Sequence, residues 1–204
     1  MADSVGTKGM PRSAREALIL DAATREFARR GFAGTSLADV AQAAGITKPL
    51  VYSYFGRKDD LFVACLARAS ADLVTEVTTR VADPRATVDT AYEVIAATLA
   101  ALEPCPYAWS LLYDVPAPTD PHLADALHEH RRRVAAVAID GVRHGAHAAG
   151  ITDEDDIGFA TEVWMSTLSA VVRWWVAHPE HSAADTVDRC RRLLGTVLAA
   201  RGQD

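Results

Sequence analysis

Apolar residues recur at intervals of three and four along most of this 204-residue chain, the spacing that places them on one face of a helix. No segment alternates apolar and polar residues for long enough to predict a strand. The pattern therefore predicts an all-α protein. Its predicted helices span about residues 13–30, 36–44, 47–55, 58–81, 84–102, 106–113, 122–149, 155–177 and 183–200.

Short polar motifs predict how the first two helices begin. Ser13 and Glu16 have the spacing of a capping box, in which each side chain accepts a hydrogen bond from the other residue's amide. Thr35 or Ser36 is placed to cap the second helix, with Asp39 in its first turn. Both helices are therefore expected to start at these residues.

The stretch 103–121, EPCPYAWSLLYDVPAPTDP, holds five prolines. Proline lacks an amide hydrogen, and its ring clashes with the preceding turn of a helix. Only a short helix, over 106–113, fits between these prolines before a loop follows.

The second and third helices have the lengths of a helix-turn-helix and are joined by the tight turn 44–46. In that motif the second helix enters the major groove of DNA. Six apolar residues can turn inward and lock the two helices together: Leu37, Val40, Ala41, Ile46, Val51 and Phe55. Other side chains of the later helix then face wholly or partly outward: Thr47, Lys48, Pro49, Leu50, Tyr52, Ser53 and Tyr54.

The outward side chains suit the floor and the walls of a DNA groove. Lys48 can donate to guanine O6 or N7, and the carbons of Pro49 and Leu50 can meet a thymine methyl group. Tyr52 and Tyr54 can donate their hydroxyls to phosphates. Pro49 also fits the first turn of the helix, where its missing amide hydrogen leaves no bond unmade.

Phosphates can also be bound at two helix N-termini. The helices that begin near Ser36 and Lys58 have amides in their first turn that point out of the helix and attract anions. The predicted DNA-binding set therefore includes Ser36 and Lys58 beside the residues of the third helix.

The run 25–62, REFARRGFAGTSLADVAQAAGITKPLVYSYFGRKDDLF, resembles the DNA-binding domain of the TetR family of bacterial transcription regulators. Spacing alone is a weak signal, but here many residues match the family pattern in register. The resemblance covers about residues 13–62, and the rest of the chain is similar only in helix number and layout. The matching residues are Phe27, Gly31, Phe32, Thr35, Ser36, Val40, Ala41, Ala44, Gly45, Tyr52, Phe55, Lys58 and Leu61.

The resemblance implies roles for single residues. It implies base contacts for residues 48–50 and phosphate contacts for Tyr52, Tyr54 and Lys58. It also implies that the rest of the chain binds a small effector and forms a dimer.

Two positions depart from the family pattern. Pro49 stands where many members have glycine, and it stiffens the start of the helix. Ala38 stands where some members read a base with arginine, so that contact is absent here. The resemblance therefore leaves the operator sequence open.

Several of these residues have simpler explanations. Phe55 is expected to be a core aromatic, and the same role is the alternative for Tyr52. Lys58 has the alternative of an ordinary solvated cation. A disordered tail is expected for the basic N-terminal arm with Lys8 and Arg12, and the alternative is that it enters a minor groove, as flexible arms do.

The net charge of −6 is unevenly distributed. Residues 1–60 carry nine Lys and Arg against seven Asp and Glu, whereas residues 61–204 carry twelve against twenty. The first segment is therefore the better partner for nucleic acid. These contrasts divide the chain into a flexible arm (1–12), a helix-turn-helix domain (13–62) and an effector-binding and dimerisation domain (63–204).

Aromatic side chains indicate a pocket in the acidic part, although aromatic stripes at helical spacing are more often core. Trp109 and Tyr113 are preferred as pocket residues, because they lie in a short helix between prolines, where cavities tend to form. The lining favours an apolar or aromatic effector. The aromatic set is Phe62, Tyr92, Tyr107, Trp109, Tyr113, Phe159 and Trp164, and the predicted effector contacts are Phe62, Tyr92, Trp109, Tyr113 and Trp164.

The helix over 155–177 has two apolar stripes, although a surface helix needs only one. The first stripe is Ile157, Ala160, Trp164, Leu168, Val171 and Trp175. The second, Val163, Thr167, Ala170 and Trp174, can pack against another subunit, with full burial in the same chain as the alternative. The last helix would complete a four-helix interface through Val187, Leu193, Leu194, Val197 and Leu198.

No cofactor and no metal site are predicted. His144 and His147 lie one turn apart, but nothing fixes a third ligand. The three cysteines Cys65, Cys105 and Cys190 fit neither a disulfide framework nor a zinc site. Because there is no signal-peptide pattern and no apolar run near the roughly 20 residues that span a bilayer, a cytoplasmic protein is expected.

The sequence thus predicts a ligand-responsive repressor that binds a palindromic operator as a homodimer and is released by a small effector. The alternative is an all-α enzyme or small-molecule carrier whose N-terminal hairpin is merely structural. No sequence motif of a hydrolase, metalloprotease or nucleotide-binding enzyme is present. A regulator that senses no ligand is a third hypothesis.

Overall fold

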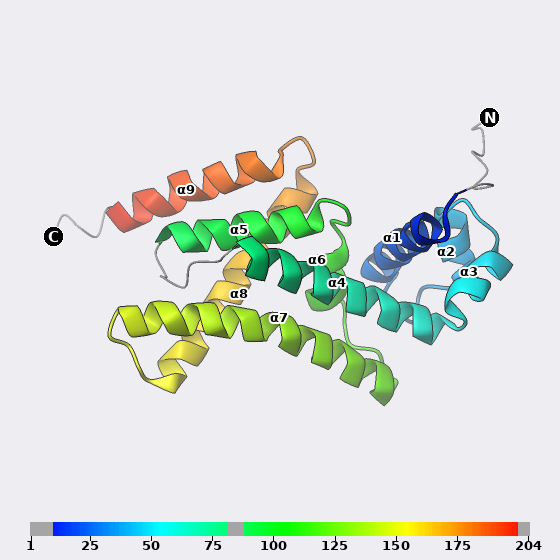
Figure 1. Cartoon of the computed structure of the whole chain (residues 1–204), viewed down its shortest axis with the longest axis horizontal. Coiled ribbons are helices and arrows are strands. Elements are labelled where there is room, and N and C mark those ends of the chain that lie inside the picture. The colour runs from blue at the N-terminus through cyan, green and yellow to red at the C-terminus, as the bar shows by residue number, and fades with distance from the viewer. Residues whose placement is uncertain (1–9, 81–87, 200–204) are drawn as a thin grey trace. The chain divides into compact units, whose positions relative to one another are not determined.

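The computed structural model describes residues 10–80 and 88–199, apart from the side chains of residue 88 and of residues 194–199. These residues form helices and no strand, which confirms the predicted all-α class (Figure 1). The helices are α1 (Arg12–Arg30), α2 (Leu37–Ala43), α3 (Lys48–Phe55), α4 (Lys58–Arg80), α5 (Val88–Leu102), α6 (Ala108–Tyr113), α7 (Pro121–Ala148), α8 (Glu154–Ala177) and α9 (Ala183–Ala199).

Helix boundaries mostly lie within two residues of the predicted ones, but the start of α1 differs in its cause. The capping box of Ser13 and Glu16 does not form, because α1 begins at Arg12 and Ser13 already lies inside its first turn. Pro11 precedes the helix with a φ of −53° and no side-chain cap. A proline ring presets such an entry. The predicted start of the fifth helix, at residue 84, lies outside the described residues.

Two compact units make up the chain. Unit one contains Met1–Ala71 and Tyr107–Arg131, and unit two contains Asp72–Pro106 and Arg132–Asp204. Helices α4 and α7 contribute residues to both units. The predicted boundary at residues 62 and 63 stays a prediction, since compactness alone does not test it.

Unit one is built on α1, which packs against α2 and α6, while α2 packs against α3. Figure 1 shows α1, α2 and α3 together with the start of α4. Apolar side chains from each of these helices fill the core because they share one face of their own helix. The buried set includes Ile19, Leu20, Ala23 and Phe27 of α1, Val40 and Ala41 of α2, Val51 of α3, Leu61, Phe62, Cys65 and Leu66 of α4, and Trp109, Leu111 and Leu112 of α6.

An aromatic cluster joins the start of α4 to α1. The Phe62 ring meets the edge of Phe27 and of Phe32, with ring centres 5.1 Å apart in both pairs. Edge-to-face pairs of this kind stabilise a core beyond the area that they bury. The first turns of α4 are therefore part of the same packed body as α1.

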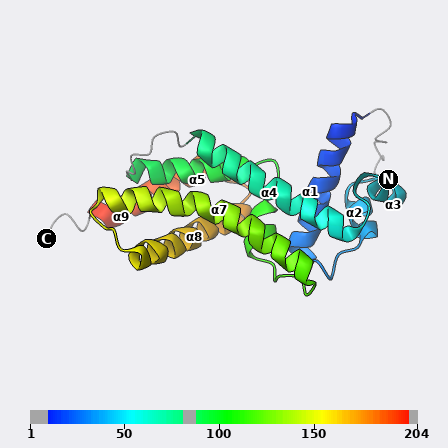
Figure 2. The same ribbon diagram turned by 60° about the horizontal axis from the view of Figure 1, so that its bottom comes forward.

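Unit two pairs α5 with α9, and α8 also contacts α9. In Figures 1 and 2 a short turn joins the end of α7 to the start of α8. Arg143 and Glu154 form an ion pair of 3.1 Å across that turn. The buried side chains of the unit include Tyr92, Ile95, Leu99 and Leu102 of α5, Ile157, Thr161, Leu168, Val172 and Trp175 of α8, and Thr186 and Val187 of α9.

None of the helices in the described part of the chain is both long enough and apolar enough to cross a membrane.

Candidate nucleic-acid interface

The turn between α2 and α3 is closed by backbone hydrogen bonds. The Ala44 amide donates to the Val40 carbonyl at 2.9 Å, and the Ile46 amide donates to the Ala41 carbonyl at 3.0 Å. Gly45, between them, has a φ of +66°, a backbone conformation that residues with a β-carbon rarely adopt. The glycine therefore lets the chain reverse within three residues, as a helix-turn-helix requires.

Helix α3 has one buried face and one exposed face. Val51 is fully buried against the core, and Leu50 and Phe55 are half-buried. Four side chains of α3 are exposed, as predicted, and together they form a surface that we call the α3 row: Lys48, Pro49, Tyr52 and Ser53. Tyr52 leaves 60% of its surface in solvent, so it is not the core aromatic that was the alternative for it.

The smaller polar groups of α3 are partly engaged. The Ser53 hydroxyl donates to the Leu50 carbonyl at 2.7 Å, while its side chain remains exposed. Thr47 precedes the helix as its N-cap residue and makes no side-chain cap. The Thr47 hydroxyl is thus exposed beside the α3 row, as expected of a phosphate or base contact.

Tyr54 is held from the side by the start of α1. Its hydroxyl accepts a hydrogen bond of 3.2 Å from Arg15, and the Arg12 guanidinium lies over its ring at 5.0 Å. A cation over an aromatic face is attracted by the ring's electrons. Arg12 is therefore part of α1 and not of a flexible tail, while residues 1–9 of the predicted arm lie outside the described residues.

Lys58, at the start of α4, is half-buried and already holds two acceptors. Its ammonium donates to the Phe32 carbonyl at 3.0 Å and to the Thr35 carbonyl at 3.1 Å. It also lies 4.1 Å from the centre of the Phe32 ring. An ammonium has three protons, so one remains for a phosphate.

Ser36 forms a capping box with Asp39. The Asp39 amide donates to the Ser36 hydroxyl oxygen at 3.2 Å, and the Ser36 amide donates to the Asp39 carboxylate at 2.9 Å. These bonds to Ser36, with the nearby Arg30 guanidinium, hold the pKa of Asp39 below its ordinary value of 3.8. The amides that the sequence assigned to an anion at this end are thus partly engaged within the protein.

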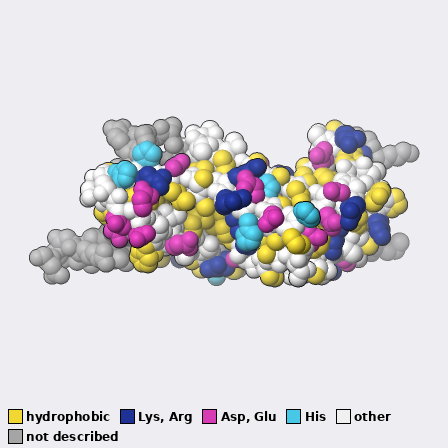
Figure 3. Space-filling view, turned by 90° about the horizontal axis from the view of Figure 1, so that it is seen from below, with side chains coloured by type: hydrophobic (Ala, Val, Ile, Leu, Met, Phe, Trp, Pro, Cys, Tyr) yellow, Lys and Arg dark blue, Asp and Glu magenta, His cyan; other side chains and the backbone are white. Residues whose placement is uncertain are grey.

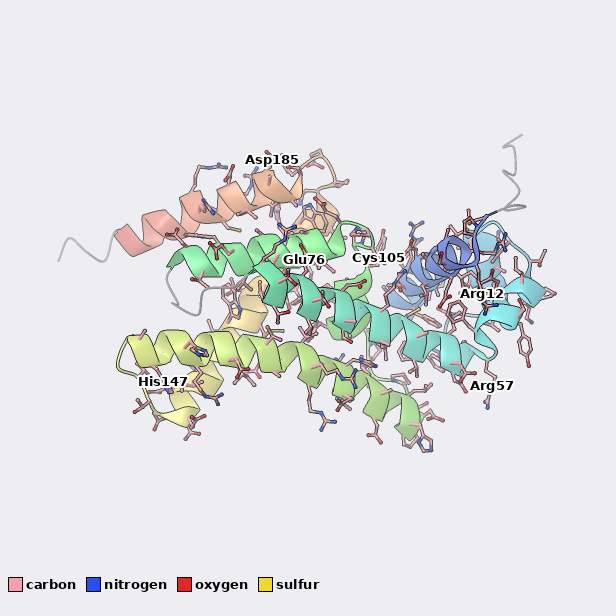
Figure 4. The ribbon with its side chains drawn as sticks, in the orientation of Figure 1. Arg12, Arg57, Glu76, Cys105, His147 and Asp185 are labelled. Atoms are coloured by element: carbon pink, nitrogen blue, oxygen red, sulfur yellow. The ribbon has the colours of Figure 1, made fainter. Side chains whose placement is uncertain are left out.

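Three arginines near α3 were missed or misplaced by the sequence analysis. Arg57 precedes α4 with a largely exposed side chain and pairs with Asp59 at 3.0 Å. Figure 4 shows Arg57 in the turn between α3 and α4, and Arg12 at the first turn of α1. Arg15 and Arg12 reach Tyr54 from 39 or more residues away in sequence, so no local pattern signals the contact.

Charge on the surface is mixed where it can be seen. Figure 3 shows basic, acidic and apolar side chains interspersed over the face that it draws. No broad field of one sign is seen on that face. The distinguishing feature of the α3 row is a compact group of exposed side chains on a short, firmly packed helix.

Comparison with known proteins identifies this arrangement. A sequence model of the family described as "Bacterial regulatory proteins, tetR family" matches residues 19–65. The HTH-type transcriptional repressor SCO4008 of Streptomyces coelicolor is 30% identical over 172 residues, 82% of this chain and 81% of that protein. The chain belongs to the TetR family. It is therefore a DNA-binding transcription regulator, and the alternative prediction of an all-α enzyme is wrong.

Two further TetR-family comparisons cover nearly the whole chain. The HTH-type transcriptional repressor KstR2 of Rhodococcus jostii is 29% identical over 195 residues, 92% of this chain and 91% of that protein. The crystal structure of a TetR-like transcriptional regulator from Rhodococcus sp. RHA1 superposes with a TM-score of 0.65. It is 25% identical and covers 93% of this chain and 98% of that one.

The predicted effector residues are divided between the two units of this TetR-family protein. Tyr92 and Trp164 belong to unit two, and Tyr92 is buried with Arg191 over its ring at 5.4 Å. Phe62 is buried in the aromatic cluster under α1, in unit one, and its predicted effector contact stays a prediction. Trp109 and Tyr113 do lie together, with ring centres 4.7 Å apart.

The second apolar stripe of α8 is largely solvent-exposed. Val163 leaves 50% of its surface in solvent, Ala170 is exposed, and Thr167 is half-buried. Phe159, which the sequence analysis grouped with the pocket aromatics, is 73% exposed, so it is not part of a core or a pocket within its own chain.

Other predicted interface residues of unit two differ from this pattern. Trp174 is half-buried, and its ring stacks on His178 and His181. On α9, Leu193 is 63% exposed, while the side chains of Leu194 and Val197 lie outside the described residues. The buried stripe of α8 is shifted by one residue from the predicted stripe at two places. Thr161 and Val172 are buried, whereas Ala160 is exposed and Val171 is half-buried.

Proposed function

We propose that this TetR-family regulator is a repressor that binds a palindromic operator as a homodimer and is released by a small effector. The observation that carries the proposal is the α3 row, whose exposed Lys48, Pro49 and Tyr52 stand on a helix anchored by Val51. Side chains that project from a fixed helix can reach base edges in a major groove. Repression is supported by the names of SCO4008 and KstR2, both called transcriptional repressors.

Within this proposal, the residues of the interface have distinct tasks. Lys48, Pro49 and Leu50 contact bases, since they lie at the start of α3. Thr47, Tyr52, Ser53 and Tyr54 contact phosphates or sugars, together with Ser36 and Lys58 at the neighbouring helix starts. Arg12, Arg15 and Arg57 add positive charge around them and increase the salt dependence of binding.

The homodimer in this proposal forms through α8 and α9. Large apolar side chains are exposed on both helices, among them Phe159 and Val163 of α8 and Leu193 of α9. Burying them against a second copy of the chain would remove this apolar surface from water. A two-fold dimer presents two α3 helices and therefore requires a palindromic site. Such a regulator acts on the chromosome in the bacterial cytoplasm.

Selection of bound sequences from random duplex DNA tests the proposal. We expect enrichment of a palindrome whose half-sites are about one helical turn, or a multiple of it, apart. Binding should weaken steeply with salt, because phosphate contacts release counterions. Enrichment of no sequence, or of a single asymmetric half-site, would contradict the proposal.

A further inference from the structure

Tyr113, the last residue of α6, has a buried hydroxyl for which the described part of the chain supplies no hydrogen-bond partner. Native proteins contain few such groups, and each one lowers the stability of the fold. Burial raises the pKa of Tyr113 to about 12. The hydroxyl therefore keeps its proton at physiological pH and can donate it to an acceptor.

Arg131 of α7 lies in the same unit and interacts electrostatically with Tyr113. Its guanidinium is half-buried and donates to two backbone carbonyls, those of Leu112 and Val115. No carboxylate pairs with it among the residues that the structure describes. Burial of the guanidinium lowers the pKa of Arg131.

Among the described residues, the half-buried guanidinium lacks a counter-ion and the buried hydroxyl lacks an acceptor. Both groups can therefore donate to the same ligand. Arginine has five N–H donors, and the two carbonyls occupy only some of them. A carboxylate can accept from a guanidinium and a phenol together, and such charge-assisted bonds are the strong ones. One anionic group would thus satisfy both side chains.

The surroundings of this pair are apolar. The Trp109 ring lies 4.7 Å from the Tyr113 ring and is almost fully buried. Leu111, Leu112 and Val115 on the same segment are also buried. An inorganic anion would gain nothing from these side chains, whereas a compound with an apolar body would.

We propose that Tyr113 and Arg131 form the anion anchor of the effector site, and that the effector is an apolar or aromatic compound carrying one carboxylate. The inference rests on the proposed ligand response and names its chemistry. The hydroxyl of Tyr113 and the guanidinium of Arg131 donate to the carboxylate, and Trp109 packs against the apolar body.

The test uses the full-length protein and a homologous series of ω-phenyl carboxylates, from phenylacetate to phenylhexanoate. Each carboxylate is compared with the alcohol of the same chain length. Dissociation constants are measured by calorimetry, and tryptophan fluorescence reports on Trp109. We expect at least one carboxylate to bind at least about tenfold more tightly than its alcohol, because the alcohol leaves the guanidinium without a counter-ion. Sodium phosphate and sodium sulfate are run as inorganic anions and should bind more weakly than that carboxylate.

Two variants with matched controls locate the site. Tyr113→Phe and Arg131→Gln should each weaken binding of the carboxylate at least about tenfold. Tyr107→Phe, on a tyrosine whose ring lies under Arg25, and Arg133→Gln, on an exposed arginine two residues along α7, should leave it unchanged. Tyr113→Phe should also raise the melting temperature without ligand by roughly 2–4 °C, since it removes an unpaired buried hydroxyl.

Several outcomes would overturn the anchor: no carboxylate binds, carboxylates and alcohols bind equally, inorganic anions bind as well, or both site variants bind normally. A lower melting temperature of ligand-free Tyr113→Phe would also overturn it, because the hydroxyl would then have a stabilising partner. Operator binding without ligand is measured separately. If the ligand-free wild-type protein binds no operator, the repressor proposal is refuted. The ligand measurements would still show whether Tyr113 and Arg131 bind the carboxylate.

Discussion

The ammonium nitrogen of Lys58 lies 3.0 Å from the backbone carbonyl oxygen of Phe32 and 4.1 Å from the centre of its ring. A residue that the TetR pattern assigns to phosphate binding therefore also ties α4 to the segment between α1 and α2. The carbonyl of Thr35 is the second acceptor, at 3.1 Å. Lys58 thus has a structural contact that can be separated from its DNA contact by experiment.

The first prediction separates these two roles. Lys58→Ala should lower the free energy of unfolding by about 1–2 kcal/mol, since it removes charge-assisted hydrogen bonds that are partly exposed to solvent. It should also weaken binding to all DNA sequences and lower the salt slope by about 1. Urea unfolding and operator titrations at several salt concentrations measure the two effects.

Arg57→Ala is the matched control, because Arg57 is the neighbouring cation and its guanidinium pairs only with Asp59, on the surface, among the described residues. It should lower the salt slope with little change in stability. If Lys58→Ala unfolds at the same urea concentration as the wild-type protein, the structural role of Lys58 is refuted.

The second prediction concerns sequence preference. Lys48 is exposed at the first turn of α3, where a side chain can reach a base edge. Lys48→Ala should relax the preference at one base pair of each half-site, at a cost of about 1–3 kcal/mol for the preferred base, and leave stability unchanged. Titration of operators with single substitutions measures this. Gln42→Ala, at an exposed position of α2, is the control, and equal losses across all operators would show that Lys48 contacts only phosphate.

The third prediction concerns pH. The pKa of Asp39 is lowered in the folded state, first by the Ser36 hydroxyl and then by the Ser36 amide, so the folded protein holds that proton less tightly than the unfolded one. The stabilisation is therefore complete above the ordinary pKa of 3.8 and is lost as the pH falls through the lower folded-state pKa. Asp39→Asn should unfold at lower urea concentration than the wild-type protein at pH 7, and the difference should shrink below about pH 4.

Asp185 provides a matched case in unit two. It forms the same capping box with Ser182 at the start of α9, and its pKa is lowered by the same kinds of bond. Asp185→Asn should show the same pH dependence of stability. Only Asp39→Asn should also weaken operator binding, because Asp39 lies on α2, which packs against α3, whereas Asp185 belongs to unit two. A difference from wild type that does not shrink as the pH falls below about 4 would contradict both assignments.

The helices and the exposed face of α3 could be predicted because their causes are local. Gly45 at the turn, the Ser36 and Asp39 cap and the buried Val51 all follow from spacing within a few residues. The family register then identified the α3 row. The error at α1 was local too: Pro11 sets the entry to the helix, so the Ser13 motif is not used.

Contacts between distant segments could not be predicted. The sequence grouped Phe62 with the pocket aromatics and did not show that its ring packs on Phe27 and Phe32, about 30 or more residues earlier in the chain. The link between Arg15 and Tyr54 and the coupling of Arg131 to Tyr113 also join separate helices. Periodicity gives the face of a helix and does not give the element that packs on it.

The last prediction concerns assembly, and the structure changes which residue tests it best. Trp174 belongs to the predicted interface stripe, but its ring stacks on His178 and His181 and has Arg189 over it at 4.8 Å. Trp174→Glu would therefore disturb the packing of its own unit. Val163 is half-exposed and makes no such contacts. Val163→Glu should therefore leave the protomer folded while it places a charge in the proposed subunit interface.

We expect Val163→Glu and Phe159→Glu to be folded monomers or weak dimers that bind the full palindrome at least about tenfold more weakly, since a desolvated charge in an interface costs several kcal/mol. Sedimentation and circular dichroism measure assembly and folding, and operator titration measures the affinity. Thr75→Glu, at an exposed position of α4, controls for added negative charge and should stay dimeric. If Val163→Glu remains a dimer with normal operator affinity, α8 is not the interface, and a monomeric wild-type protein would exclude the dimer itself.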